Sequence, residues 1–489
     1  MAILAIDAGT TGVTALVVDE HGRVRSRGYA GFPQHFPQPG WVEHDPQEIW
    51  DATLRAIADA RAVCDLPLAS VGITNQRETI VLWDRQSLRS PRRAIVWQDR
   101  RTAAIVDELR GRAVETGVRH TTGLGLDPYF SSTKLLWLSR HEPQTWRGVI
   151  DGSIAIGTVD SYLIARMTGG TSHVTDATNA SRTQLADIRT CAWDPDLLDL
   201  FDVPASALPD IRPSYGDFGT TDPEAFAGLS IPITGVAGDQ QAALFGQTAF
   251  DAGDAKCTYG TGAFILLNTG NRLTMSKHGL LTTVGIQHRN GRIDYALEGS
   301  VFVAGAAVQW LRDGLGIIAY SDDVESLASQ VASSEGVVFV PALTGLGAPY
   351  WDPYARGTVI GITRGTTAAH IARATLDAIA FQVRDVVDAM VADVGKPLAQ
   401  LRVDGGAAAN NLLLQTQADL LRTKVVRSQA LEMTGLGAAF LAGLGSGVWS
   451  SLSELRSTLG VDSAFTPMSD GPDYELWKRA VDRAREWID

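Results

Sequence analysis

Three glycine-rich turns, each directly after a β-rich run, are the segments of this sequence best suited to hold phosphate. They lie at residues 7–12 (DAGTTG), 259–262 (YGTG) and 403–407 (VDGGA). Glycines let the backbone approach phosphate oxygens, while threonine hydroxyls and free N–H groups donate hydrogen bonds to them. No Gly-Lys-Ser/Thr follows, so none of the turns is a Walker A motif. One such turn is usually only a turn, but three in one chain favour a bound nucleotide.

Two aspartates lie where a phosphoryl-transfer site needs carboxylates. Asp7 ends the first β-rich run, and Asp239 follows an apolar run in the segment GVAGDQQAA. Asp7 could simply form a turn and Asp239 could simply cap a helix. An aspartate at a strand end beside a phosphate turn is also what Mg²⁺ or a general base requires. The residues alone leave both interpretations open.

A polar stretch between two strand-like runs, residues 75–79 (NQRET), could bind a small polyol. Arg77 and Glu78 offer a bidentate donor beside an acceptor, although a surface loop has the same composition. The aromatic candidates Trp97, Tyr129 and Phe264 are residue types found most often in cores. The nine histidines show no HExxH or other metal-binding spacing.

Bulk properties limit the class of protein. A chain of 489 residues is too long for one hydrophobic core, which predicts two domains or a duplicated architecture. The formal net charge of -13 argues against nucleic acid and anionic membranes as partners. Three separated cysteines without a CxxC pair exclude a cysteine-rich zinc site and a disulfide framework, and they suit a reducing compartment. With no signal peptide expected, we predict a cytoplasmic protein.

An uncharged segment, residues 433–453, is long enough to span a bilayer. It contains five glycines together with serines and a threonine. We therefore predict a buried, closely packed helix with glycine-rich ends, and no membrane span.

The order of elements predicts an α/β fold. Asp45-Pro46-Gln47-Glu48 predicts a helix start, residues 369–394 form an amphipathic pattern ended by Gly395, and residues 410–421 read as a helix after the third turn. Strand-like runs alternate with these helices. The first two turns each lie between β-rich runs and are about 250 residues apart, which suggests two related halves. We expect a boundary near residues 246–253, giving domains 1–248 and 249–489.

The sequence resembles the glycerol kinases of the FGGY carbohydrate kinase family. The resemblance runs in order from residue 3 to about residue 450. It is carried by DAGTTG, WVEHDPQEIW, GITNQRET, AIVWQDRR, DPYFSSTK, GTVDSYLI, AGDQQAALFGQ, TYGTGAF, YALEGSVFVAGAAVQWLRD, GLGAPYWDPYARG and RVDGGAAANN.

This resemblance implies two RNase-H-like domains of the actin-like ATPase type, facing each other across a catalytic cleft, and a reaction between MgATP and glycerol. It implies that Asp239 is the catalytic base and that Asp7 and Asp239 lie near Mg²⁺. The residues implied to bind glycerol are Arg77, Glu78, Trp97, Tyr129, Asp239, Gln240 and Phe264. Those implied to contact the nucleotide are Thr10, Thr11, Gly12, Thr261, Gly262, Gly305, Gln309, Gly406 and Asn410. We also expect a homo-oligomer, either a dimer or a tetramer.

Two features depart from the family pattern. Relatives often carry an arginine shortly after the first turn, where this sequence reads Gly12-Val13-Thr14. Some related bacterial kinases bind fructose 1,6-bisphosphate on a basic loop, but residues 217–233 contain no Lys or Arg here. We therefore expect no inhibition by that effector. The alternatives are a kinase for another polyol or ketose, and an actin- or Hsp70-like ATPase.

Overall fold

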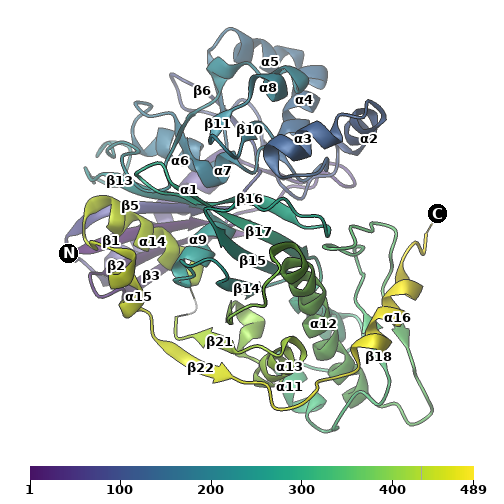
Figure 1. The fold of residues 1–489 in the computed structure, drawn as a ribbon. Helices are drawn as coiled ribbons and strands as arrows, with labels where there is room; N and C mark the ends of the chain where they lie inside the picture. The colour runs from purple at the N-terminus through teal and green to yellow at the C-terminus, as the bar shows by residue number, and fades with distance from the viewer. Residues whose placement is uncertain (431, 489) are drawn as a thin grey trace.

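Two β-sheets form the centre of the molecule (Figure 1). The computed structural model describes residues 1–430 and 432–488. The first sheet has five strands in the order β13 (Ile233–Gly238), β5 (Leu68–Asn75), β1 (Ala2–Ala8), β2 (Gly12–Asp19) and β3 (Val24–Gly31). Strands β1, β2 and β3 are antiparallel, whereas β5 is parallel to β1 and β13 is parallel to β5. The first glycine-rich turn is therefore the tip of the β1–β2 hairpin.

The second sheet repeats this arrangement with seven strands. Their order is β16 (Leu281–Gln287), β17 (Ile293–Val301), β15 (Ala263–Gly270), β14 (Ala255–Tyr259), β20 (Leu401–Asp404), β21 (Val425–Ser428) and β22 (Val461–Phe465). Strands β14 and β15 form an antiparallel hairpin, and β20 lies parallel to β14. The second turn is the tip of this hairpin, and the third turn follows β20. Both halves thus place a hairpin tip beside the end of a parallel strand, and the two hairpins are those that the sequence predicts.

Helices cover these sheets, and small two-stranded sheets complete the fold. The helices are α1 (Pro46–Val63), α2 (Ala103–Gly111), α3 (Glu115–Thr122), α4 (Ser131–His141), α5 (Pro143–Ile150), α6 (Val159–Met167), α7 (Ala177–Ala180), α8 (Pro195–Leu200), η1 (Ala205–Ala207), α9 (Asp239–Gly246), α10 (Gly305–Asp313), α11 (Asp323–Ala328), α12 (Ala368–Val394), η2 (Gly406–Ala409), α13 (Asn411–Leu421), α14 (Met433–Ser446), α15 (Leu452–Thr458) and α16 (Tyr474–Ala484). The remaining strands are β4 (Glu43–His44), β6 (Val81–Asp84), β7 (Ala94–Ile95), β8 (Ile154–Gly157), β9 (Val174–Asp176), β10 (Ala186–Asp187), β11 (Ala192–Trp193), β12 (Asp210–Arg212), β18 (Val338–Val340) and β19 (Thr358–Ile360).

The predicted helix signals are confirmed at α1, α12 and α13. The Asp45 side chain caps α1 by accepting the N–H of Gln47, but Glu48 faces His35 instead of completing a capping box. Helix α12 ends at Gly395, which adopts a left-handed φ of 73°. Asn410 caps α13 rather than forming its first helical residue, because its side chain accepts the N–H of Leu413.

Helix α14 is the buried, glycine-rich helix that the sequence predicts. It packs so closely on the first sheet that a Cβ on Gly72 of β5 would lie 2.2 Å from the Ala438 carbonyl oxygen. On its other side, a Cβ on Gly437 would lie 1.8 Å from the carbonyl oxygen of Ala242 in α9. Among the residues described, no helix is long and apolar enough to cross a membrane. Although it comes late in the chain, α14 therefore covers the N-terminal sheet (Figure 1).

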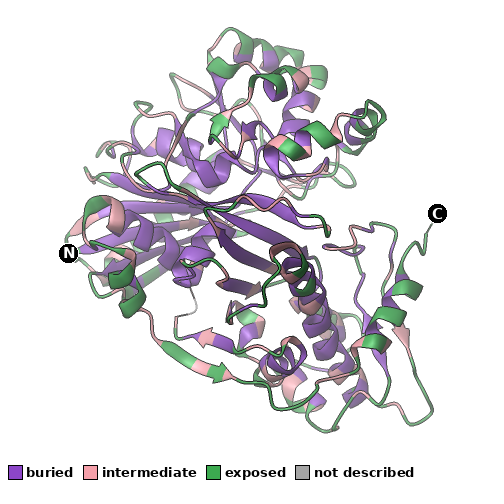
Figure 2. Cartoon of the chain, viewed as in Figure 1, coloured by how far each residue is buried: buried purple, intermediate pink, exposed green. Residues whose placement is uncertain are grey.

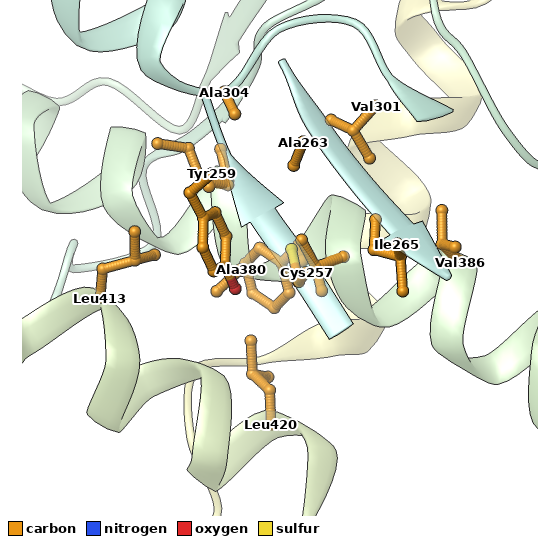
Figure 3. Close-up of a cluster of buried hydrophobic side chains, with 14 of the residues drawn as sticks. Cys257, Tyr259, Ala263, Ile265, Val301, Ala304, Ala380, Val386, Leu413 and Leu420 are labelled. Atoms are coloured by element: carbon orange, nitrogen blue, oxygen red, sulfur yellow. The ribbon is translucent and has the colours of Figure 1, made fainter. Parts of the chain in front are cut away.

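Hydrophobic side chains fix the strands that end at the turns. Figure 2 shows the central strands of both sheets as buried, whereas the edge strand β22 is largely exposed. In the second half, Cys257 and Tyr259 of β14 pack against α12 and α13, where Leu413 and Leu420 face them (Figure 3). The Tyr259 hydroxyl donates a 2.7 Å hydrogen bond to Gln417 on α13. The second turn therefore starts from a strand end that is held in place.

Candidate active site

The first turn contacts the polar stretch that the sequence singles out. Across the turn, Gly9 N–H donates to the Gly12 carbonyl at 3.0 Å. The Gln76 side chain donates to the Gly9 carbonyl at 3.0 Å, and the Trp97 indole N–H donates to Thr10 Oγ1 at 3.0 Å. Thr11 is exposed at the tip. The first turn, residues 75–79 and Trp97 therefore lie together.

The second turn, the third turn and the start of α10 form one compact group. Gly305 N–H donates to the Gly260 carbonyl at 3.0 Å, and a Cβ on Gly305 would lie 2.6 Å from that oxygen. A Cβ on Gly262 would lie 2.3 Å from the Val301 carbonyl oxygen. A Cβ on Gly405, which has a φ of 87°, would lie 2.4 Å from the Tyr259 carbonyl oxygen. The structure thus brings the predicted nucleotide residues of the second half together, with Thr261, Gly406 and Gln309 exposed.

Helix α9 places Asp239 beside Arg77. Asp239 is the first residue of the helix and directly follows β13, and the N-cap position belongs to Gly238. The helix-cap interpretation of Asp239 is therefore wrong. Its Oδ1 lies 3.0 Å from Arg77 Nε and accepts the N–H of Gln240 at 2.7 Å. The Asp239 side chain remains 29% exposed, so its carboxylate is accessible to a reactant.

The polar stretch at residues 75–79 is buried, which excludes the surface-loop interpretation. Arg77 donates through Nη1 and Nη2 to the two carboxylate oxygens of Glu298, at 2.6 and 2.9 Å. Glu78 accepts from Arg182 Nε at 2.6 Å, and Arg182 Nη2 also reaches Glu298 at 3.2 Å. Glu78 adopts a left-handed φ of 62°, a strained conformation that is commonest at functional sites.

This arrangement corrects the expectation that Arg77 offers a bidentate donor to a polyol. Of the five N–H groups of a guanidinium, Nε faces Asp239, Nη1 donates to Glu298 and Gln241, and Nη2 donates to Glu298. Three N–H groups therefore donate hydrogen bonds and the Nε–H is occupied by the ion pair with Asp239, so one N–H remains. Burial would raise the pKa of Glu298, but Arg182 and Arg77 hold it at about 2, so this carboxylate stays ionised.

Sequence reasoning missed Glu298 and Arg182. Glu298 lies 221 residues from Arg77 and belongs to the other sheet. Its signal is an acidic residue flanked by apolar and small residues in β17, because a buried charge requires a partner.

The three predicted aromatic residues are half-buried rather than part of the core. The Trp97 and Tyr129 rings meet edge to face with centroids 5.6 Å apart. The Arg182 guanidinium lies 5.6 Å from the centre of the Tyr129 ring. The Lys134 ammonium, buried below Tyr129, donates to the carbonyls of Pro128, Tyr129 and Phe130 and holds this loop. Trp97 and Tyr129 thus lie next to the Arg77–Glu78 cluster. Phe264 lies on β15, opposite Ser300 of β17.

Gln240 connects α9 to the second sheet. Its side-chain oxygen accepts from the buried Lys256 ammonium at 2.5 Å. Lys256 also donates to Thr258 at 3.0 Å, and burial lowers its pKa. The amide nitrogen of Gln240 therefore remains free to donate to a ligand.

Comparisons with known proteins identify the family. The model of the FGGY family of carbohydrate kinases, N-terminal domain, matches residues 2–246, and that of the C-terminal domain matches residues 255–446. The chain belongs to the FGGY family of carbohydrate kinases. It is 55% identical to a glycerol kinase of Aromatoleum aromaticum over 99% of both chains. It is 51% identical to a glycerol kinase of Bdellovibrio bacteriovorus, covering 98% of this chain and 99% of the relative.

Solved structures confirm the predicted α/β fold class, two RNase-H-like domains as in actin-like ATPases. The structure of Plasmodium falciparum glycerol kinase with ADP matches with a TM-score of 0.93 and 37% identity, over 99% of this chain and 98% of that chain. A gluconate kinase from Lactobacillus acidophilus matches with a TM-score of 0.88 over 99% of this chain and 96% of that chain. At 23% identity, the second likeness concerns the fold alone.

The carboxylates of this FGGY kinase fit a magnesium ion held partly by a substrate. Burial, the charge of Asp239 and the charge of Glu432 raise the pKa of Asp7 to about 8, so a cation near Asp7 would relieve their repulsion. Within residues 1–430 and 432–488, no group of three or more His, Cys, Asp or Glu side chains could hold a metal alone. One or two carboxylates completed by phosphate oxygens are what Mg²⁺ commonly takes.

Thr14 occupies the position where relatives often carry arginine. It is a largely buried residue of β2 and pairs in register with Asp7 on one side and Tyr29 on the other. The Tyr29 hydroxyl lies 2.6 Å from where a Cβ on Gly12 would stand. A tyrosine therefore lies over this side of the first turn.

Proposed function

We propose that this FGGY kinase is a glycerol kinase, which transfers the γ-phosphoryl group of MgATP to glycerol and gives glycerol 3-phosphate and ADP. The observation that carries the proposal is the buried Arg77–Glu78 pair beside the accessible carboxylate of Asp239. It offers a single donor, an acceptor and a base within one small space, which suits a three-carbon polyol. Identities of 50 to 55% to glycerol kinases over nearly the whole chain support the same substrate.

Asp239 is the proposed general base. Arg77 and the Gln240 N–H hold its Oδ1, which leaves Oδ2 to accept the proton of the attacking hydroxyl. The alkoxide character that develops on this hydroxyl drives its attack on the γ-phosphorus. The partial exposure of Asp239 gives glycerol access to it.

The proposed glycerol contacts follow from the groups left free. Arg77 donates its one remaining N–H, Glu78 accepts through its second oxygen, and the Gln240 amide donates. Tyr129 adds a hydroxyl, and Asp239 receives the reacting one. Trp97 and Phe264 would cover the carbon chain.

The proposed nucleotide site lies between the two hairpin tips. Thr10, Thr11 and Gly12 would contact the transferred phosphate from the first sheet. The contacts proposed from the second half are Thr261, Gly262, Gly305, Gln309, Gly406 and Asn410. Asp7 and Asp239 would hold Mg²⁺, which supplies charge neutralisation of the phosphates when it is bound. Residues 1–248 and 249–489 are the two proposed domains, with α14 of the second packed on the sheet of the first.

A homo-oligomer, dimer or tetramer, and a location in the cytoplasm complete the proposal. Light scattering on the purified chain measures the mass of the assembly directly. A mass of one chain at micromolar concentration would exclude a stable oligomer.

A panel of acceptors with coupled detection of ADP tests the substrate. We expect MgATP-dependent ADP release with glycerol and little with D-xylulose or D-gluconate. Faster release with a ketose or sugar acid would assign the chain to another member of the family. Release that ignores every acceptor would instead indicate an ATPase of the actin or Hsp70 kind.

A further inference from the structure

We propose that Glu298 is a positioning residue of the polyol site, reaching into it from the opposite sheet to hold Arg77 and Arg182. The inference rests on the proposed function, because it assigns a role in that same site. Glu298 is fully buried on β17, whereas Arg77 lies two residues beyond the end of β5 in the first sheet. The network therefore crosses from one half of the molecule to the other.

The geometry gives Glu298 control over the direction of Arg77. Two parallel hydrogen bonds, at 2.6 and 2.9 Å, fix the plane of the guanidinium. That plane decides where the single free N–H points and keeps Nε 3.0 Å from Asp239. Gln241 adds one contact to Nη1 at 3.1 Å but cannot define a plane alone.

Glu298 also controls Glu78 through Arg182. Arg182 donates from Nη2 to Glu298 and from Nε to Glu78, so one rigid guanidinium spans both carboxylates. Its Nη1 is buried without a hydrogen-bond partner among the described residues. Leaving a buried donor without a partner costs free energy, so the contacts of Arg182 with the two carboxylates must hold it in this position.

Glu298 balances the charges of the fully buried part of the network, which does not include the partly exposed Asp239. Arg77 and Arg182 carry two positive charges, and Glu78 and Glu298 carry two negative ones, with all four side chains at most 2% exposed. Without Glu298, Arg77 is free to rotate toward Glu78, whose Oε1 already lies 3.9 Å from its Nε. That rotation would turn the free N–H of Arg77 away from the direction in which glycerol needs it.

Strand β17 provides an internal check on damage to the fold. Three residues beyond Glu298, the Val301 carbonyl packs against Gly262 in the proposed nucleotide turn. A general distortion of β17 would therefore also disturb ATP binding. Loss of positioning alone would disturb glycerol binding and leave ATP binding intact.

The test compares Glu298→Gln with wild type in the full chain. We expect the KM for glycerol to rise roughly 10- to 100-fold, the equivalent of one charge-assisted hydrogen bond, with the KM for ATP within about twofold. The matched control is Asp294→Asn, because Asp294 is another buried carboxylate of β17 and pairs with His288 and Arg292 instead. This control should lower Tm without changing the KM for glycerol.

A charge-balanced double variant, Glu298→Gln with Arg182→Met, covers the case in which Glu298→Gln folds poorly. Among the fully buried side chains it retains one arginine, Arg77, and one carboxylate, Glu78, so stability should recover while the KM for glycerol stays raised. An unchanged KM for glycerol in either folded variant would overturn the inference, as would equal rises for glycerol and ATP. If wild type does not phosphorylate glycerol, the proposed function fails, and the same comparison is made with the acceptor that the panel identifies.

Discussion

Replacing Arg77 by alanine separates its contribution to folding from its contribution to glycerol binding. The side chain is only 2% exposed and contacts Glu298, Asp239 and Gln241. Its removal leaves Glu298 with Arg182 as its remaining arginine partner. Breaking a buried ion pair of this kind costs about 3–5 kcal/mol in the free energy of unfolding.

The loss in glycerol affinity expected for Arg77→Ala is smaller than it would be if Arg77 bound glycerol through two hydrogen bonds. Because four of the five N–H groups are engaged within the protein, glycerol loses one charge-assisted hydrogen bond. Such a bond is worth about 1.5–3 kcal/mol, which corresponds to roughly one to two decades in Kd. ATP loses no direct contact, so its Kd should change far less.

Calorimetric titration of glycerol and of ATP, beside urea unfolding, measures both effects. Arg373→Ala is the matched control, since Arg373 pairs with the buried Asp377 on α12 and has no proposed role in the site. This control should lose stability and keep both affinities. Equal losses of glycerol and ATP affinity in Arg77→Ala would refute the reasoning and leave Arg77 a structural role.

Four other outcomes follow from particular contacts. Asp239→Asn should lower turnover roughly 10²–10⁴-fold with little change in Tm, because an amide cannot accept the hydroxyl proton. Near-normal turnover would show that Asp239 is not the general base. Gly262→Ala should raise the KM for ATP more than the KM for glycerol in steady-state kinetics, because the new Cβ would lie 2.3 Å from the Val301 carbonyl oxygen. An unchanged KM for ATP would contradict the proposed role of this turn in nucleotide binding. Burial raises the pKa of Asp385 from 3.8 to about 6. The contribution of this group to the free energy of unfolding is therefore fully present below about pH 4, and about 3 kcal/mol of it is lost as the pH rises through 6. The Tm advantage of wild type over Asp385→Asn should accordingly shrink from pH 4 to 6.5, and a constant difference would count against this pKa. Finally, fructose 1,6-bisphosphate should not inhibit at low ionic strength, because residues 217–233 carry no Lys or Arg of their own and the nearby Arg212 is engaged by Asp217; saturable sub-millimolar inhibition would reveal a missed site.

Local sequence signals predicted the hairpins, the turns and the capped helices. The cap at Asp45 and the close of α12 at Gly395 depend on residues next to them in the chain. The glycines of α14 predicted a tightly packed helix, because close contact between backbones requires several residues without a side chain. These features could be inferred without knowing which elements meet in space.

The polar network of the site could not be predicted, because it depends on contacts between distant segments. Arg77 reads as a free donor in the sequence, and only the position of β17 shows that Glu298 engages it. The sequence suggests that Gln240 binds a hydroxyl of the substrate, but its side-chain oxygen accepts a hydrogen bond from Lys256 of β14. The roles of the predicted site residues toward glycerol and ATP stay predictions, as does the boundary at residue 248.

The most direct test of the central claim is the stoichiometry of products in one reaction mixture. Phosphorus NMR of the enzyme with MgATP and glycerol resolves ADP, inorganic phosphate and glycerol phosphate together. We predict one glycerol 3-phosphate for each ADP, with negligible inorganic phosphate and no product from Asp239→Asn on the same time scale. ADP accompanied by equal inorganic phosphate and no glycerol phosphate would contradict the account, because it would show hydrolysis where the structure calls for transfer.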